Sequence, residues 1–302
     1  MLTSIKIWNE PNNVSHWDLE LDEGWARFGR LLRSGVAGVR AHTSVPIVLG
    51  GLSPIDPEFL RVLDARGELE GIDVLALHGF PLDWNLWPLE EWPDKIAGVR
   101  EEFGRPVWVT ETGASSFVSE AKAAWGVRRL GEVLRGETVH WYTLLDLVPA
   151  VEATTRHKAA EGSGYFRHFH FGLLRHDGTP KAALREFDPE FGICQWFQFG
   201  DERSLELAVR WFERLGVARV RTGLSWSESF MDGGWAWLDA IMAALEPFDV
   251  CATLCFTPGP LGIVPHHTSP PRDPSGFGEF AAEVARRYAR EEAGRAVTQL
   301  AG

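Results

Sequence analysis

The apolar positions along the chain fall into two alternating kinds of segment. Short, nearly continuous apolar runs are separated by longer stretches in which apolar residues recur with the period of a helix. The strand-like runs lie at 4–9, 45–51, 72–80, 105–112, 138–146, 190–199, 219–226 and 249–258. Strands that are apolar on both faces and alternate with helices predict a parallel sheet covered by helices.

Seven stretches of helical period separate most of these runs. They lie at 24–40, 57–67, 89–104, 119–136, 202–216, 235–248 and 276–291. After the fifth strand the helix is poorly defined, and a long insertion at 147–177 precedes the short segment 179–187. Eight such units are the number that closes a barrel. We therefore predict that residues 1–302 form a single α/β domain, a (β/α)8 TIM barrel. An open doubly wound sheet is the alternative, but no glycine-rich nucleotide motif favours it.

Composition narrows the class of protein. The 302 residues are 45% hydrophobic and 24% charged, which suits a globular protein with a large core. The formal net charge of −12 repels phosphate backbones, so we expect no nucleic-acid partner. No apolar run approaches the roughly 18 to 20 residues that cross a bilayer, so we expect no membrane contact. The N-terminal residues lack the apolar core of a signal peptide, and we expect a cytoplasmic protein.

The three cysteines support the same expectation. Cys194, Cys251 and Cys255 are an odd and sparse set, which argues against a disulfide framework and for a reducing compartment. Cys251 and Cys255 share one face of a strand-like run, where a metal pair is one interpretation. We favour two small buried residues, because free cysteine is among the most buried residue types.

One pair of carboxylates stands at strand ends. In a (β/α)8 barrel the active site lies at the C-terminal ends of the strands. Glu10 follows the first strand and Glu111 ends the fourth, three strands further around the ring. Glycoside hydrolysis with retention needs two carboxyl groups about 5 to 5.5 Å apart. We predict Glu10 as the general acid/base and Glu111 as the nucleophile.

Three polar residues are the expected neighbours of this pair. Asn9 and Glu10 would face opposite ways in a regular strand, but Pro11 ends the ladder and allows both to turn inward. Asn9 would then bond a sugar hydroxyl. A buried Arg221 would hold Glu111 ionised, the alternative being a surface arginine on a strand edge. His78 would donate to a hydroxyl or tune Glu111, the alternative being a structural core histidine.

The sequence holds 14 tryptophans and only 3 tyrosines. Indole faces stack on the apolar faces of pyranose rings, and the indole N–H bonds hydroxyl groups. We therefore expect Trp84, Trp141 and Trp226 to contact substrate, with packing as the alternative for each. His266, in the loop after the eighth strand, is a further candidate for a sugar contact.

A second set of histidines raises the alternative of a metal site. His168 and His170 alternate as they would along a strand, and with the other histidines they invite a zinc interpretation. No HExxH or similar spacing supports it. We predict no metal.

Two motifs resemble those of a known family. IWNEPN at 7–12 resembles the acid/base motif of glycoside hydrolase clan A, and VTETG at 109–113 resembles the nucleophile motif of the same clan. Within the clan the chain is most similar to the β-xylosidase and α-L-iduronidase type family, over nearly its whole length. The resemblance implies retaining hydrolysis of a β-glycosidic bond without metal or organic cofactor, on a β-xyloside or β-glucoside-like oligo- or polysaccharide. It implies that Asn9 contacts the 2-hydroxyl and that Arg221 and His78 lie near the nucleophile.

The strand order departs from that of the clan. There the acid/base follows the fourth strand and the nucleophile the seventh, whereas here they follow the first and the fourth. The chain therefore resembles a circular permutation, in which 1–187 corresponds to units 4–8, 188–290 to units 1–3, and 291–302 is a tail. The new ends would lie together on the bottom face, where permutation is tolerated. The alternative is a slice through a tandem or swapped arrangement, which would give a domain-swapped or other homo-oligomer.

Other functions remain open at this point. A barrel of this kind can bind a glycan without cutting it, or transfer the sugar to an acceptor in place of water. A permuted scaffold can also be impaired, because the strand before Glu10 begins a few residues after Met1 and is exposed to fraying. Neither the identity of the sugar nor the choice between endo and exo cleavage follows from the strand ends, because loops decide both.

Overall fold

The computed structural model describes residues 1–148 and 163–289. Within them, eight strands form one parallel sheet in the order β2-β1-β8-β7-β6-β5-β4-β3. Each strand overlaps one of the predicted apolar runs. The strands are β1 (Leu2–Ile7), β2 (Ile47–Leu49), β3 (Leu75–Gly79), β4 (Val107–Thr112), β5 (Val139–Tyr142), β6 (Gly192–Cys194), β7 (Arg219–Ser225) and β8 (Asp249–Cys255).

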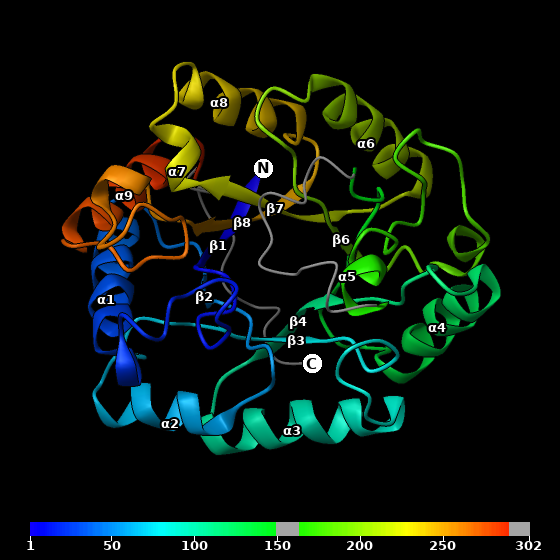
Figure 1. Ribbon diagram of the computed structural model, residues 1–302, viewed down its shortest axis with the longest axis horizontal. Coiled ribbons are helices and arrows are strands. Elements are labelled where there is room, and N and C mark those ends of the chain that lie inside the picture. Colours follow the sequence, from blue (N-terminus) through cyan, green and yellow to red (C-terminus); the bar gives the residue numbers. More distant parts are fainter. Residues whose placement is uncertain (149–162, 290–302) are drawn as a thin grey trace.

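The two ends of this strand order meet. Val48 of β2 bridges to Val74, and Leu52, just after β2, bridges to Leu77 of β3. The Leu49 N–H donates to the carbonyl oxygen of Val74 at 2.9 Å. The sheet thus closes on itself, and Figure 1 looks into the resulting ring of strands. The prediction of a (β/α)8 barrel is confirmed over that of an open sheet.

Helices surround the ring of strands (Figure 1). They are α1 (Ala26–Arg40), α2 (Pro57–Ala65), α3 (Trp92–Phe103), α4 (Glu120–Val133), α5 (Ser163–His168), α6 (Glu202–Leu215), α7 (Trp226–Ser229), α8 (Gly234–Ala244) and α9 (Ser275–Tyr288). All seven predicted helices are present. Between β5 and β6 the helices of the described residues are the short α5 and a 3-10 turn at Ala182–Glu186, as the weak helical pattern there indicated.

Local signals explain where several helices begin and end. The side chains of Asp56, Ser119 and Asp201 accept hydrogen bonds from backbone N–H groups in the first turns of α2, α4 and α6. Gly104 and Gly216 end α3 and α6 in the left-handed conformation, which glycine adopts without steric cost. These caps make the helix boundaries a property of the local sequence.

The two faces of the strands are buried against different neighbours. Ile7 points outward from β1 toward α1, where an added Cβ on Gly35 would lie 3.1 Å from its Cδ1 atom. Lys6, one position earlier, points into the barrel and bonds His78 of β3 and Thr110 of β4. The layer between strands and helices is thus apolar, whereas the interior of the barrel near its mouth is polar.

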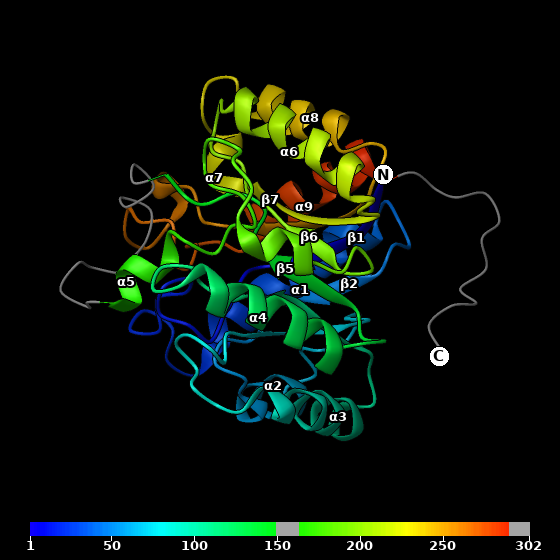
Figure 2. The same cartoon turned by 90° about the vertical axis from the view of Figure 1, so that its right-hand side faces the viewer.

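The beginning and the end of the described barrel lie together on the bottom face, as predicted. The Met1 amino group donates to the carbonyl oxygens of Glu246, at 2.7 Å, and Phe248, just before β8. Met1 and Tyr288, the last residue of α9, line the same small cavity. In Figure 2 the N-terminus lies on the opposite side of the barrel from α5 and α7, which follow strand ends.

Strand β1 is paired on both sides, by β2 and by β8, which opposes the fraying considered above. Part of the predicted insertion at 147–177, namely 149–162, and the whole predicted tail at 291–302 lie outside the described residues. No helix in 1–148 or 163–289 combines the length and apolarity that a membrane crossing requires.

Candidate active site

The backbone after β1 turns two neighbouring side chains into the mouth of the barrel. The strand ends at Ile7, and both Trp8 (φ 67°) and Glu10 (φ 44°) are left-handed. Such a conformation costs about 1–3 kcal/mol for a non-glycine residue and is concentrated at functional sites. Asn9 Oδ1 accepts from Arg221 Nη2 at 2.7 Å, and Glu10 Oε1 lies 2.7 Å from His78 Nδ1. Asn9 and Glu10 therefore both turn inward, as expected from the end of the ladder.

Glu111 is held by an arginine from the other side of the barrel. Arg221 Nη1 donates to Glu111 Oε1, and Arg221 Nε donates to Thr253 Oγ1 at 3.0 Å. Arg221 is completely buried, so the interpretation as a surface arginine is excluded. Arg221 does not lie at the end of its strand. It is the third residue of β7, and its long side chain reaches Glu111 from inside the barrel.

His78 lies between the two carboxylates. Its Nδ1 atom is 2.7 Å from Glu10 Oε1 and 3.6 Å from Glu111 Oε2. One oxygen of each carboxylate and a ring nitrogen of His78 all lie within 4.8 Å of one another. This approach depends on Gly51 after β2, since an added Cβ there would lie 2.1 Å from the His78 ring. His78 is both fully buried and part of the site.

The second oxygen of Glu10 has two partners that the sequence did not reveal. Asn13 Nδ2 donates to Glu10 Oε2 at 2.8 Å, and His16 Nε2 lies 3.2 Å from the same oxygen. His16 also stacks on Phe256, after β8, with centroids 6.3 Å apart. Both partners come from the turn that follows the motif at 7–12. The available signal was the presence of polar residues directly after the motif at 7–12.

A buried lysine lies beneath the carboxylates. Lys6 Nζ is 2.9 Å from His78 Nε2, 3.0 Å from Thr110 Oγ1 and 3.4 Å from Asn9 Oδ1. Sequence reasoning missed Lys6 and Thr110. The signal for Lys6 was its place between Ile5 and Ile7, because a lysine inside an apolar strand is seldom buried unless it is paired.

Burial and charge set the ionisation of this cluster. Burial lowers the pKa of His78 to about 4, so the ring is neutral at neutral pH. Burial works to raise the pKa of Glu111, but the charges of His78 and Arg221 lower it below its ordinary value. Because His78 is neutral at neutral pH, Arg221 is the cation that keeps Glu111 ionised there. Burial likewise opposes ionisation of Glu10, but contacts with His16 and then His78 bring its pKa well below the ordinary value.

An aromatic group borders the carboxylates. Trp84 contacts Phe80 at 4.8 Å and Phe171 at 5.0 Å between centroids, and Phe80 meets Tyr142 edge-on at 5.9 Å. Phe171 packs against Gly113, two residues after Glu111, where an added Cβ would lie 2.8 Å from its ring. Burial and then the charge of Glu111 raise the pKa of Tyr142 well above its ordinary value. Trp84 thus belongs to a cluster at the mouth of the barrel.

His266 lies further out. It is exposed, and its ring packs against His267 at 4.3 Å, which in turn meets Phe256 edge-on at 5.0 Å. A series of ring contacts runs from His266 through His267 and Phe256 to His16, which is the partner of Glu10.

Trp141 faces away from the carboxylates. Trp141 pairs in register with Thr112 of β4, which alternates with the inward-facing Glu111, so Trp141 lies on the outer face, in the hydrophobic core. Its indole N–H is buried and has no hydrogen-bond partner within the described residues.

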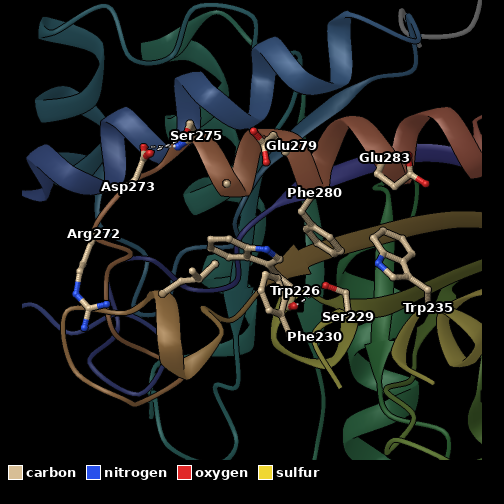
Figure 3. Close-up of a pocket in the computed structure, with 12 residues that line it drawn as sticks. Trp226, Ser229, Phe230, Trp235, Arg272, Asp273, Ser275, Glu279, Phe280 and Glu283 are labelled. Atoms are coloured by element: carbon tan, nitrogen blue, oxygen red, sulfur yellow. Dashed lines mark hydrogen bonds between the residues drawn. The ribbon is translucent and has the colours of Figure 1, made fainter. Parts of the chain in front are cut away.

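Trp226 directly follows β7 and begins α7, and it packs against Phe277 and Phe280 of α9. It lines a groove of about 800 Å³ between α7, α8 and α9, with Trp235 and Phe230 (Figure 3). The described contacts of Trp226 and Trp141 are thus packing contacts, and the roles predicted for them in substrate binding stay predictions.

Glu10, His78 and Glu111 are also the residues whose atoms are spaced to hold a metal ion, among those that the structure describes. Two cations share their surroundings, because Lys6 bonds His78 and Arg221 bonds Glu111. The positive charges of Lys6 and Arg221, so close to these three residues, oppose the binding of a metal cation. His168, from the other histidine set, packs against Trp84 and Tyr142, at 6.2 and 6.4 Å between centroids.

Comparisons with known proteins give little guidance on the reaction. No protein-family model matches the chain. A protein from Niallia circulans, described as an uncharacterized protein in the bgaB 5′ region, is 28% identical over 116 residues, which is 37% of this chain and 30% of that protein. The matched part thus spans less than a third of the relative's length.

Among solved structures, a GH128 (subgroup I) endo-β-1,3-glucanase from Amycolatopsis mediterranei, in complex with laminaripentaose, covers 61% of this chain and 70% of its own at 19% identity and a TM-score of 0.37. Dihydropteroate synthase from Xanthomonas albilineans covers 93% of this chain and 91% of its own at 14% identity and a TM-score of 0.35. The strand order and the closure of the sheet establish the fold.

Proposed function

We propose that this protein is a retaining glycoside hydrolase with Glu111 as nucleophile and Glu10 as general acid/base. The observation that carries the proposal is the spacing of the carboxylates, which have oxygen atoms within 4.8 Å of each other. Retaining enzymes hold the two carboxyl groups about 5–5.5 Å apart, whereas inverting enzymes leave about 6.5–9.5 Å for a water molecule. The spacing favours the retaining mechanism.

The surroundings of Glu111 support its role as nucleophile. Arg221 keeps Glu111 ionised, as a nucleophile must be to attack the anomeric carbon. In the first step the bond to the leaving oxygen breaks, that oxygen takes the proton of Glu10, and the sugar is bonded to Glu111. In the second step Glu10 takes a proton from water, which displaces Glu111 from the sugar. Asn9, fixed by Arg221, is placed to bond a hydroxyl of the sugar.

The environment of Glu10 predicts an acidic optimum. Its pKa is lowered because His16 and His78 stabilise the carboxylate. The first step needs Glu10 protonated, and that fraction falls as pH rises above its pKa. We therefore expect kcat/KM to fall with rising pH on the alkaline side of an optimum below neutrality.

The substrate that we propose is a β-linked oligo- or polysaccharide, a β-xyloside or β-glucoside. The aromatic group of Phe80, Trp84, Tyr142 and Phe171 next to the carboxylates supports a sugar ligand, because aromatic faces stack on pyranose rings.

The test is trapping of the covalent intermediate. The protein is incubated with a panel of activated 2-deoxy-2-fluoro β-glycosides, and labelled peptides are mapped by mass spectrometry. An adduct on Glu111 would support the retaining mechanism and identify the sugar. An adduct on another carboxylate would overturn the assignment, and no adduct on folded protein would favour a glycan-binding barrel. Transfer to an added sugar acceptor, rather than water, would identify a transglycosylase.

We also propose that the chain is a circularly permuted member of clan A. The spacing of three strands from acid/base to nucleophile matches that of the clan, and Met1 lies beside Tyr288. The test is to join residue 289 to Met1 through a short linker and to open the chain before residue 188. A variant that folds and is labelled on Glu111 would support the proposal. A chain that cannot fold in this order would contradict it, as would a stable oligomer of exchanged halves.

A further inference from the structure

Lys6 has no role in the mechanism above, yet it is a cation of the site. It is completely buried on the inner face of β1. An ammonium group has three protons and no lone pair, so every contact of a protonated lysine is a donation. Three acceptors surround it: His78 Nε2 at 2.9 Å, Thr110 Oγ1 at 3.0 Å and Asn9 Oδ1 at 3.4 Å. The number of protons matches the number of acceptors.

This arrangement determines which ring nitrogen of His78 carries the proton. A neutral imidazole has one N–H and one lone pair, and the partner of one nitrogen fixes the state of the other. Since Lys6 donates to Nε2, that atom accepts and the proton is on Nδ1. The Nδ1–H then points at Glu10 Oε1, 2.7 Å away, with Glu111 Oε2 at 3.6 Å.

The charges that act on Lys6 come from four other strands of the barrel. Arg221 from β7 opposes its protonation, Glu111 from β4 favours it, and the Cys251 and Cys194 thiols from β8 and β6 also face it. Burial and the charge of Arg221 lower the pKa of Lys6 to about 7, and burial lowers that of His78 to about 4. Between these values Lys6 is charged and His78 neutral.

We propose that Lys6 is a positioning residue that fixes His78 in the Nδ1–H tautomer, so that one ring N–H is always directed at the two carboxylates. The assignment of the tautomer follows from the contacts of Lys6 in its protonated form. Its consequence for catalysis rests on the proposed function: the same N–H then stabilises Glu10 once it has lost its proton to the leaving group. Thr110 Oγ1, also 2.9 Å from His78 Nε2, is the rival for this role.

The test is nitrogen NMR of histidine-labelled protein, at a pH between the pKa values of His78 and Lys6. His78 is assigned by the signals that disappear in His78→Gln. In the unchanged protein we expect a protonated Nδ1 and an unprotonated Nε2, and an Nε2–H signal would overturn the proposal without any variant. In Lys6→Met we expect the Nε2–H form to gain population, because Thr110 Oγ1 is then free to accept from it and only the Glu10 carboxylate still favours the Nδ1–H form.

Two further variants complete the experiment. Thr110→Val should keep the Nδ1–H tautomer, because Lys6 remains. Loss of that tautomer in Thr110→Val but not in Lys6→Met would assign the role to Thr110 and contradict the proposal. Lys181→Met removes a different buried lysine, paired with Asp146, and should leave His78 unchanged. The signals are read without substrate, so this outcome is separate from the presence or absence of a covalent adduct on Glu111.

Discussion

Ile5, Lys6 and Ile7 are consecutive residues of β1, and all three are completely buried. The two isoleucines face the helices, where burial of their side chains contributes about 1.5–3 kcal/mol each. The lysine faces the barrel interior, where an ion costs several kcal/mol unless its partners compensate. The outer face of the strands therefore supplies stability. The inner face lowers stability, because it holds a cluster of paired charges in fixed positions away from water.

The same contrast recurs on other strands. On β7, Val220 is buried in the hydrophobic core, whereas Arg221 spans the barrel to reach Glu111. On β4, Val109 belongs to the core and Glu111 to the site. Substitutions on the two faces should therefore separate loss of function from loss of stability.

The largest expected effect is that of removing the nucleophile. Glu111→Ala should lower kcat by a factor on the order of 10⁴ to 10⁶, the range seen when an essential nucleophile or its partner is removed. Added azide should restore part of the activity by attacking the anomeric carbon in place of the carboxylate. An active Glu111→Ala variant without azide would end the assignment.

The next prediction compares the loss of a charged residue on the inner face with the loss of an apolar residue in the outer layer. Arg221→Met should destabilise the fold by about 3–5 kcal/mol, because it leaves Glu111 buried without its cation. Phe212→Ala, on α6 against Phe248, should cost a similar 3–5 kcal/mol through the cavity it leaves. Denaturant unfolding measures both.

Only the variant of the inner face should change the chemistry. Arg221→Met should abolish labelling of Glu111, whereas folded Phe212→Ala should be labelled at an ordinary rate. Equal losses of activity in both variants would contradict the separation of the two faces.

A smaller effect is a pH dependence of stability from Lys6. Its pKa is about 7 in the folded protein and 10.5 in the unfolded chain. Between these values the unfolded state binds more protons, so this residue makes stability rise with pH, by up to about 1.4 kcal/mol per unit. The difference in unfolding free energy between the unchanged protein and Lys6→Met should show this slope. A flat difference would mean that Lys6 stays protonated in the folded protein across the range, so that its pKa is not lowered by folding.

The smallest effect concerns His16, in the turn that follows the motif at 7–12. His16→Gln should raise the pKa of Glu10, because it removes the partner that lowers it most. The alkaline limb of kcat/KM should then move up by about 1 pH unit. His266→Gln is the matched control, since the contacts that lower the pKa of Glu10 are those with His16 and His78, and it should leave the limb in place. If the alkaline limb of kcat/KM does not move in His16→Gln, His16 does not control the ionisation of Glu10.

The sequence by itself determined the fold class and the two carboxylates. Eight apolar runs and seven amphipathic stretches were readable because the outer face of every strand and one face of every helix must be apolar to form the core. Glu10 and Glu111 were readable because each lies in a short motif at a strand end, where a barrel places its chemistry.

Only the tertiary structure decided how that pair is held. Arg221 lies mid-strand, and only its reach across the barrel brings it to Glu111. Lys6 and His78 are 72 residues apart and meet because β1 and β3 both face the interior. Trp141 and Trp226 share the residue type expected at a sugar site, but the direction of each strand position puts their indoles in packing layers. Periodicity records which positions are buried, whereas closure of the barrel decides which buried positions face one another.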